Sequence, residues 1–243
     1  MGKYFGTDGI RGVAGEYLDT TMAYNVGLGL RKALDSDTVV IGKDTRESSD
    51  MLALSLAAGA MRAGMDVLYA GIVPTPVIAH YSKEKAMPGI MITASHNPYA
   101  DNGIKVIDKG YKMSEESEAI IEAFIDNPEP PKTKRFGSFK QAEDIMSVYR
   151  NLYAPFKDEK MNLTVCFDTA NGATYEVAPD ILSPLVDALF QVHGNPDGKN
   201  INENCGSMHI EAIQEAVSEH GCDLGFSFDG DGDRVLAVDH KGR

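Results

Sequence analysis

The chain has few cysteines and no long apolar segment, and both absences narrow its class. Its 243 residues include three cysteines, Cys166, Cys205 and Cys222, which form neither an even set nor a Cys-x-x-Cys pair. This pattern argues against a disulfide framework or a zinc ribbon and fits a reducing compartment. No apolar run approaches the roughly 20 residues that cross a bilayer, and the start, MGKYFGTDG, lacks a signal-peptide core. We therefore expect a cytoplasmic protein with no membrane contact.

Basic residues are also scarce. Lys and Arg number 23 against 36 Asp and Glu, which gives a net charge of −13. Binding to duplex nucleic acid needs a basic face that displaces counterions, so no nucleic-acid partner is expected. An anionic small molecule would still need a local basic cluster within this acidic chain.

What the chain does contain is an alternation of short apolar runs, typical of buried strands, with longer helical patterns. We expect strands over 38–42, 65–71, 89–93, 103–107, 162–168, 187–194, 222–228 and 235–239, and helices over 48–64 (with a serine cap), 74–86, 114–125, 141–156, 175–186 and 209–221. Strands separated by helices imply layered α/β folds. We predict two consecutive three-layer α/β/α sandwich domains with mixed sheets, residues 1–155 and 156–243.

Two connecting segments support this organisation. The segment NPEPPKTKRFGSF (127–139) is proline-rich and then basic, and indicates an exposed connection. The last residues, VLAVDHKGR, stop directly after an expected strand. We expect that this is not the natural end of the domain series.

The segment FDGDGDR (228–234) places Asp229, Asp231 and Asp233 at alternate positions between glycines. Glycine lets the backbone curl so that the carboxylates converge, and converging carboxylates repel unless a cation lies among them. Oxygen ligands suit Mg²⁺ or Mn²⁺. An EF-hand is excluded, because its sixth and twelfth positions hold Arg234 and His240 instead of Gly and Glu. A solvated Asp-Gly turn is the alternative.

Ser95, in TASHNPYADNGIK (93–105), follows an expected strand. No G-x-S-x-G elbow is present, and adjacent residues of an extended chain point to opposite sides, so His96 is not expected to be its base. Arg11 in GTDGIRG and Arg46 in GKDTRESS lie in loops of small residues, where the planar guanidinium suits phosphate oxygens. Either arginine could instead form a surface ion pair.

Taken together, GTDGIRG, GKDTR, PTP (74–76), TASHNP with DNGIK, and FDGDGDR resemble the α-D-phosphohexomutases, which interconvert sugar 1-phosphates and 6-phosphates. These motifs extend in order over nearly the whole chain. GTDGIRGVAG, DTANGAT (168–174) and NINENCGSMH (200–209) most resemble the bacterial phosphoglucosamine mutase branch.

This resemblance implies roles for individual residues. Ser95 matches the family's phosphorylated serine, and Asp229, Asp231 and Asp233 match the ligands of one Mg²⁺, which a phosphoserine oxygen completes. Arg11 and Lys105 match residues near the transferring phosphate, with Lys105 a candidate for proton transfer. The remaining matches, expected to bind phosphate or to support the site, are His96, Arg46 and Arg234.

The resemblance also implies a reaction and a missing half. Phospho-Ser95 would interconvert glucosamine 6-phosphate and glucosamine 1-phosphate through a sugar 1,6-bisphosphate, which also serves as activator. Family members have four domains, and this chain matches the first two, so sugar recognition is absent and the fragment is expected to be inactive alone. A homodimer is expected for the full-length chain. The alternatives are a phosphoglucomutase or phosphomannomutase, a phosphatase, and a non-catalytic metal-binding half-chain.

Overall fold

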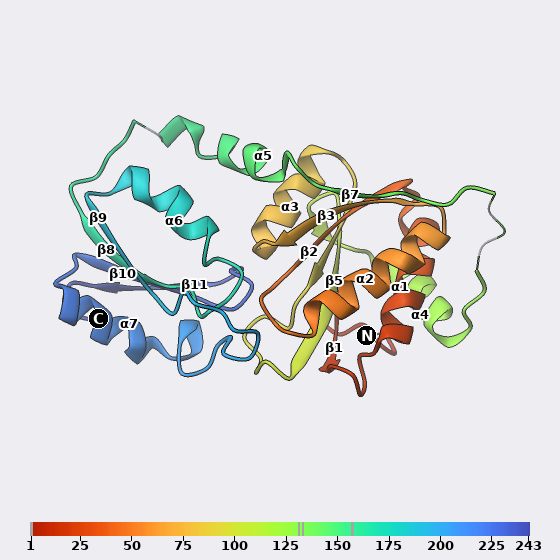
Figure 1. Ribbon diagram of the computed structural model, residues 1–243, viewed down its shortest axis with the longest axis horizontal. Coiled ribbons are helices and arrows are strands. Elements are labelled where there is room, and N and C mark those ends of the chain that lie inside the picture. The colour runs from red at the N-terminus through yellow and green to blue at the C-terminus, as the bar shows by residue number, and fades with distance from the viewer. Residues whose placement is uncertain (1, 131, 133, 157) are drawn as a thin grey trace.

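The computed structural model describes residues 2–130, 132, 134–156 and 158–243. Two α/β units lie side by side, each built on a sheet with helices on both faces (Figure 1). The fold class expected from the sequence, two consecutive three-layer sandwiches with mixed sheets, is confirmed. None of the described helices combines the length and apolar character that a bilayer crossing requires.

The first sheet has the strand order β1-β5-β4-β2-β3-β7, with β6 paired to β5. Strands β4, β2, β3 and β7 run parallel, whereas β5 is antiparallel to both of its neighbours, β4 and β1. The strand bounds are β1 Ile10–Val13, β2 Thr38–Lys43, β3 Asp66–Ile72, β4 Pro88–Ile92, β5 Asp101–Asp108, β6 Tyr111–Lys112 and β7 Phe139–Gln141.

Helices cover both faces of this sheet. One face carries α1 (Thr20–Leu34), α2 (Ser49–Arg62) and α4 (Glu115–Asp126), and the other carries α3 (Thr75–Glu84) and α5 (Ile145–Asn151). Helix α1 has no counterpart among the elements expected from the sequence, and neither have strands β1 and β6. Arg11, expected in a loop, lies in β1, where it pairs in register with Gly103 of β5. Gly27 of α1 and Gly59 of α2 let the two backbones touch, because an added Cβ would lie 2.1 Å from Leu56 O and 2.0 Å from Tyr24 O respectively.

Three further details differ from the expected helices. Ser48 is the N-cap of α2 but makes no capping hydrogen bond; its hydroxyl accepts from Asn102 Nδ2 instead, at 2.9 Å. The helix expected over 141–156 is shorter, because Gln141 pairs with β3 in strand β7 and Ala154–Phe156 form a 3₁₀ turn. The helix expected over 175–186 is α6 (Val177–Leu182), followed by a 3₁₀ turn that contains Pro184.

The second sheet has the order β11-β10-β8-β9, with β11 antiparallel and the others parallel. Helix α6 lies over one face and α7 (Ile210–His220) over the other (Figure 1). The strand bounds are β8 Thr164–Asp168, β9 Ala188–Val192, β10 Leu224–Phe228 and β11 Val235–Asp239. A boundary at residue 155 remains a proposal; Ile145 and Tyr149 of α5 pack in the same cluster as Val77 and Tyr81 of α3.

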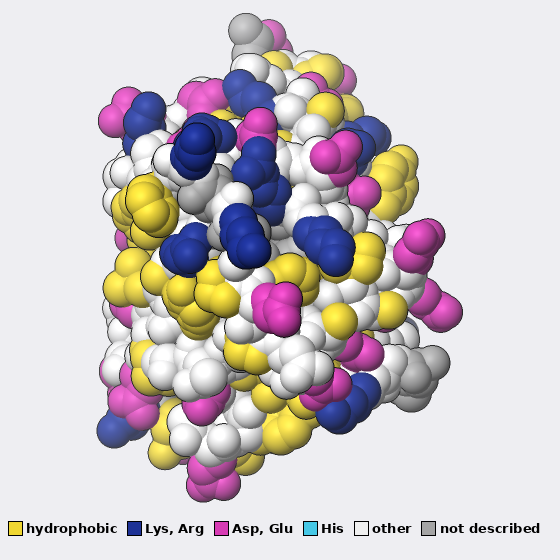
Figure 2. Space-filling view, turned by 90° about the vertical axis from the view of Figure 1, so that its right-hand side faces the viewer, with side chains coloured by type: hydrophobic (Ala, Val, Ile, Leu, Met, Phe, Trp, Pro, Cys, Tyr) yellow, Lys and Arg dark blue, Asp and Glu magenta, His cyan; other side chains and the backbone are white. Residues whose placement is uncertain are grey.

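The expected connection over 127–139 is exposed in most of its described residues. It lies at the end of the first unit that faces away from the second sheet (Figure 1). Lys and Arg side chains gather on this end of the molecule (Figure 2). Carboxylates accompany these cations, as where Arg31 Nη2 lies 2.6 Å from Asp37 Oδ1.

The carboxyl ends of strands from both sheets meet between the two units. Thr45, after β2, donates its hydroxyl to Asn171 O, after β8, at 2.6 Å. The backbone N–H of Thr75 donates to Asp231 O at 2.9 Å. Ligands of open α/β sheets collect beyond the carboxyl ends of strands, so this meeting point is where a site is expected.

Candidate active site

The acidic loop after β10 brings its three carboxylates together. Asp229, Asp231 and Asp233 each offer a ligand oxygen, and these oxygens all lie within 4.8 Å of one another. Asp229 and Asp231 are fully buried. Gly230 permits the loop to pass beneath the serine loop, because a Cβ there would lie 2.7 Å from Ser95 O. The predicted convergence of the three carboxylates is therefore observed.

Ser95 meets this loop from the other unit. It follows β4, and its hydroxyl donates to Asp229 Oδ2 at 2.6 Å. Its φ of 55° lies in the left-handed region, which costs a non-glycine residue about 1–3 kcal/mol and persists only where the surroundings enforce it. The backbone conformation thus turns the hydroxyl towards the carboxylates at an energetic cost that its contacts must offset.

Arg46 makes many of the contacts that hold the serine loop in this conformation. The side chain is 1% exposed, and its Nε donates to Asp44 Oδ2 at 2.9 Å. Its other four N–H groups donate to carbonyls of the serine loop, those of Ser95 (3.0 Å), Asn97 (2.8 Å), Asp101 (3.0 Å) and Pro98. All five donors are used, so the guanidinium supports the loop and is not available to bind phosphate, one of the two roles considered from the sequence.

Lys105 of β5 contacts the other two carboxylates of the acidic loop. Its Nζ donates to Asp231 Oδ2 and Asp233 Oδ2, both at 2.8 Å, and lies 3.1 Å from Asp8 Oδ2. Burial lowers the pKa of Lys105, but Asp231 and Asp233 outweigh it and raise that pKa above its ordinary value. Lys105 is therefore an ammonium group that partly neutralises the acidic loop.

One cation is not enough for three carboxylates. Burial, together with the charges of Asp231 and Asp233, raises the pKa of Asp229 to about 7. Burial also acts to raise the pKa of Asp231, but the charge of Lys105 and the hydrogen bonds from Lys105 and Thr75 outweigh burial, so the pKa of Asp231 is lowered overall. Within the described residues, Asp231 Oδ1 is buried without a hydrogen-bond partner. An oxygen-rich pocket with an unused buried oxygen and a carboxyl reluctant to ionise fits a divalent cation.

Arg11 and Arg234 border an open hollow of about 650 Å³, which is also lined by Thr7 and Asp233. Arg11 pairs with Asp8 through one terminal nitrogen, while its Nε is buried without a hydrogen-bond partner among the described residues. Arg234 is half-exposed, with its Nε 3.8 Å from Asp233 Oδ1. Both side chains thus border space that an anionic ligand could enter.

His96 lies closer to the serine than its sequence position suggested. Its Nδ1 is 3.5 Å from Ser95 Oγ. The expectation that the two side chains point apart assumed an extended chain and is wrong, because Ser95 has left-handed backbone angles. Burial, and then the charges of Arg234 and Arg11, lower the pKa of His96, so its ring is neutral. At 3.5 Å, its hydrogen bond with the Ser95 hydroxyl is weak.

Comparison with known proteins places the chain. The family model described as "Phosphoglucomutase/phosphomannomutase, alpha/beta/alpha domain I" matches residues 2–132, and that of domain II matches residues 145–242. The chain belongs to the phosphoglucomutase/phosphomannomutase family. Two phosphoglucosamine mutases, from Carboxydothermus hydrogenoformans and Acetivibrio thermocellus, are each 44% identical to it, over 100% of this chain and 57% of theirs.

A solved family member shares the arrangement of the two units. The phosphoglucomutase/phosphomannomutase family protein of Burkholderia thailandensis matches 99% of this chain and 55% of its own, with 28% identity and a TM-score of 0.83. The chain therefore spans little more than half the length of the relatives it matches.

Three residues that hold the site were assigned no role from the sequence. Thr75 donates its hydroxyl to Asp231 Oδ2 at 2.6 Å, and Asp8 links Arg11 with Lys105. Asn202 of the second unit donates to Ser95 O at 2.9 Å and to Asn97 O at 3.1 Å. All three lie in motifs that carried the family resemblance, so the motifs pointed to them although no spacing rule did.

Proposed function

We propose that the chain is the phosphoryl-donor half of a phosphohexomutase that interconverts glucosamine 6-phosphate and glucosamine 1-phosphate through phospho-Ser95. The observation that carries this proposal is the 2.6 Å contact between Ser95 Oγ and Asp229 Oδ2, which joins a left-handed serine of one unit to the acidic loop of the other. In this place, a phosphate carried on Ser95 would meet a cation held by the acidic loop.

The charges on the two loops explain why a cation belongs there. A phosphoserine carries about −1.5 to −2 charges, and the three aspartates add up to three more. Ser95, as phosphoserine, would hold one Mg²⁺ together with Asp229, Asp231 and Asp233. When bound, that ion would act as a Lewis acid on the phosphoryl group.

The chain's own cations would then contact the phosphate. Arg11 and Arg234 border the hollow and would stabilise the charge spread over the phosphate oxygens. Lys105, held as an ammonium group, would act as the proton donor in transfer. His96 and Arg46 would support the serine loop. Because a mutase must keep water from its phosphoserine, the burial of Ser95 is consistent with transfer rather than hydrolysis.

The identity of the sugar phosphate is inferred from the relatives. Glucosamine phosphate is favoured by the relatives at 44% identity, and phosphoglucomutase or phosphomannomutase activity is the alternative. A sugar 1,6-bisphosphate would be both the intermediate and the activator, in the cytoplasm, with a homodimer proposed for the full-length protein. Since this chain spans 57% of those relatives, we expect it to accept phosphate without interconverting sugar phosphates.

Mapping of phosphate on the purified chain tests the proposal. After incubation with Mg²⁺ and glucosamine 1,6-bisphosphate, intact mass and peptide mapping should place one phosphate on Ser95. The variant Ser95→Ala should lose it, and the control Ser147→Ala, at an exposed serine of α5, should keep it. Phosphate at another residue would refute the donor role. Steady release of inorganic phosphate would favour a phosphatase, and no phosphorylation would favour a non-catalytic metal-binding half-chain.

A further inference from the structure

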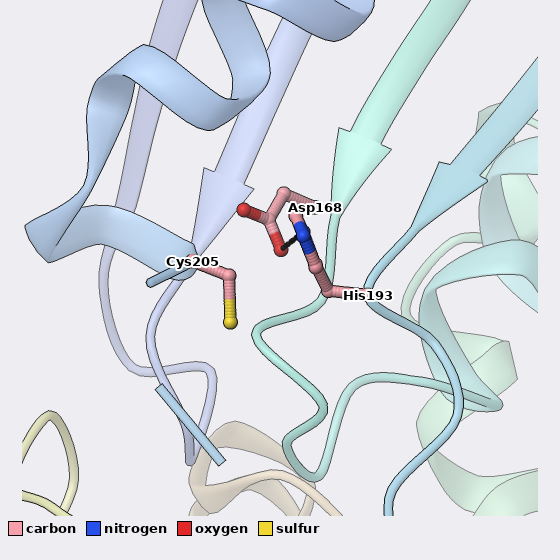
Figure 3. A group of neighbouring side chains, drawn as sticks. All are labelled: Asp168, His193 and Cys205. Carbon is pink, nitrogen blue, oxygen red and sulfur yellow. Dashed lines mark ion pairs between the residues drawn. The ribbon is translucent and has the colours of Figure 1, made fainter. Parts of the chain in front are cut away.

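A second group of metal-ligating side chains lies in the second unit. It contains Asp168 at the end of β8, His193 directly after β9, and Cys205 in the loop before α7. Carboxylate, imidazole and thiol lie side by side in Figure 3. Each offers one ligand atom, and these atoms all lie within 4.8 Å of one another. The group is separate from the three aspartates of the acidic loop.

Hydrogen bonds to the Asp168 carboxylate and to the His193 carbonyl hold the loops around this group. Asp168 accepts from the N–H groups of Ala170 (2.8 Å) and Gly206 (2.7 Å), so its carboxylate ties its own loop to the residue after Cys205. His193 has a left-handed φ of 48°, and its carbonyl accepts from Asn171 N and Thr169 Oγ1, both at 2.7 Å. The Asp168 carboxylate and the backbone at His193 and next to Cys205 are therefore held by interactions that do not use the imidazole or the thiol.

The imidazole nitrogen and the thiol sulfur each have one polar contact. His193 Nδ1 is 3.1 Å from Asp168 Oδ1, yet this buried nitrogen has no hydrogen bond of acceptable geometry among the described residues. Cys205 is fully buried, and its sulfur has a distant contact with Asn171 Nδ2 at 4.0 Å. The contact with Asp168 raises the pKa of His193, and a cation held between the two side chains would take the place of the shared proton beside a buried thiol.

We propose that Asp168, His193 and Cys205 bind a thiophilic divalent cation of the Zn²⁺ class. Sulfur, nitrogen and oxygen ligands select Zn²⁺ over Mg²⁺, which prefers oxygen alone. Tetrahedral zinc with bonds of about 2.0–2.3 Å needs ligand atoms roughly 3.3–3.8 Å apart. The ligand atoms lie within 4.8 Å of one another, so binding of the ion requires rotation of the His193 and Cys205 side chains to close this spread. The side chain of His193 is 36% exposed, so the group lies near the protein surface; water would be the fourth ligand.

This site is distinct from the proposed Mg²⁺ site in chemistry and readout. The three aspartates contain no sulfur, so a sulfur-to-metal absorption band cannot arise there. The inference therefore does not depend on phosphoryl transfer, and either proposal can fail without the other.

Cobalt titration of the metal-stripped chain tests the inference. With excess Mg²⁺ present and at mildly alkaline pH, Co²⁺ should bind once per chain with a sulfur-to-cobalt band in the near ultraviolet, and Zn²⁺ should abolish that band. Cys205→Ser should remove the band, and His193→Gln should weaken Co²⁺ affinity at least about tenfold. The matched control Cys222→Ser removes another buried thiol and should keep the band.

The contrary results are equally specific. A wild-type chain without the band, a Cys205→Ser variant that retains it, or a Cys222→Ser variant that loses it would overturn the proposal, and the Asp168–His193 contact would then be a simple ion pair. If Cys205→Ser does not fold, as judged by circular dichroism, the half-exposed His193→Gln variant decides, because unchanged Co²⁺ affinity there contradicts the site.

Discussion

Replacing Arg46 tests whether the serine loop is held by a buried guanidinium. Arg46→Met keeps much of the side-chain volume but removes all five N–H donors and leaves Asp44, which is fully buried, without its cation. Breaking a buried ion pair costs about 3–5 kcal/mol. The carbonyls of Ser95 and Asn97 keep a second donor in Asn202, so their lost hydrogen bonds to Arg46 should add little to this loss of unfolding free energy.

This loss is large enough to measure directly. With a urea dependence of about 2 kcal/mol per M, a loss of about 4 kcal/mol lowers the unfolding midpoint of the first unit by roughly 2 M, as followed by circular dichroism. Arg150→Met is the matched control, because Arg150 and Asp180 form an exposed pair worth less than about 1 kcal/mol. Arg46→Lys should fall between, since an ammonium keeps the charge but not the fork of donors.

A urea unfolding midpoint for Arg46→Met equal to that of Arg150→Met would contradict this expectation. It would mean that the guanidinium does not stabilise the loop. Ser95 phosphorylation lost at unchanged stability would then point to Arg46 as a phosphate ligand, the role that its buried hydrogen bonds argue against.

Three further changes have defined outcomes. Asn202→Ala removes two hydrogen bonds to the serine loop and should cost about 1–3 kcal/mol and slow Ser95 phosphorylation. Asn204→Ala is the matched control, because Asn204 is exposed and shares the left-handed backbone of Asn202; it should cost less and leave Ser95 phosphorylation unchanged, and equal effects would contradict the contact. Burial raises the pKa of Glu122, but backbone N–H donors of the N-terminal segment bring it below 4.5. Its stabilisation is therefore present at neutral pH and lost as pH falls through that lowered pKa, so the difference in unfolding free energy between wild type and Glu122→Gln should shrink on acidification; a constant difference would refute this. Mg²⁺ at 100 times its dissociation constant should stabilise the chain by about 2.7 kcal/mol, measured by urea unfolding with and without chelator, and Asp231→Asn should abolish that gain.

Local sequence patterns were sufficient to predict β2 to β5, β8 to β11 and the acidic loop, but not the short strands β1, β6 and β7. Apolar runs such as 38–42 and 89–93 are buried in the sheet, and alternation of Asp with Gly let the three carboxylates converge. These features depend on a few neighbouring residues, which is why periodicity and turn chemistry capture them.

Features that depend on distant partners could not be predicted. The side of the chain on which His96 lies depends on the left-handed backbone of Ser95, which contacts from Arg46 and Asn202 impose over 49 and 107 residues. Helix α1 packs through Gly27 against α2, and a glycine within a helical pattern gave no signal of that contact. The role of Arg46 likewise appears only once the carbonyls of the serine loop are placed around it.

The metal dependence of Ser95 phosphorylation shows whether the serine and the acidic loop act together. The chain is mixed with glucosamine 1,6-bisphosphate, and the mass of the intact protein is followed over time with Mg²⁺ and with chelator. We expect one added phosphate, on Ser95, that forms with Mg²⁺ and whose formation is slowed by at least an order of magnitude by chelator or by Asp231→Asn. Equal phosphorylation under all three conditions would contradict this expectation, because Ser95 would then receive phosphate without the acidic loop that contacts it.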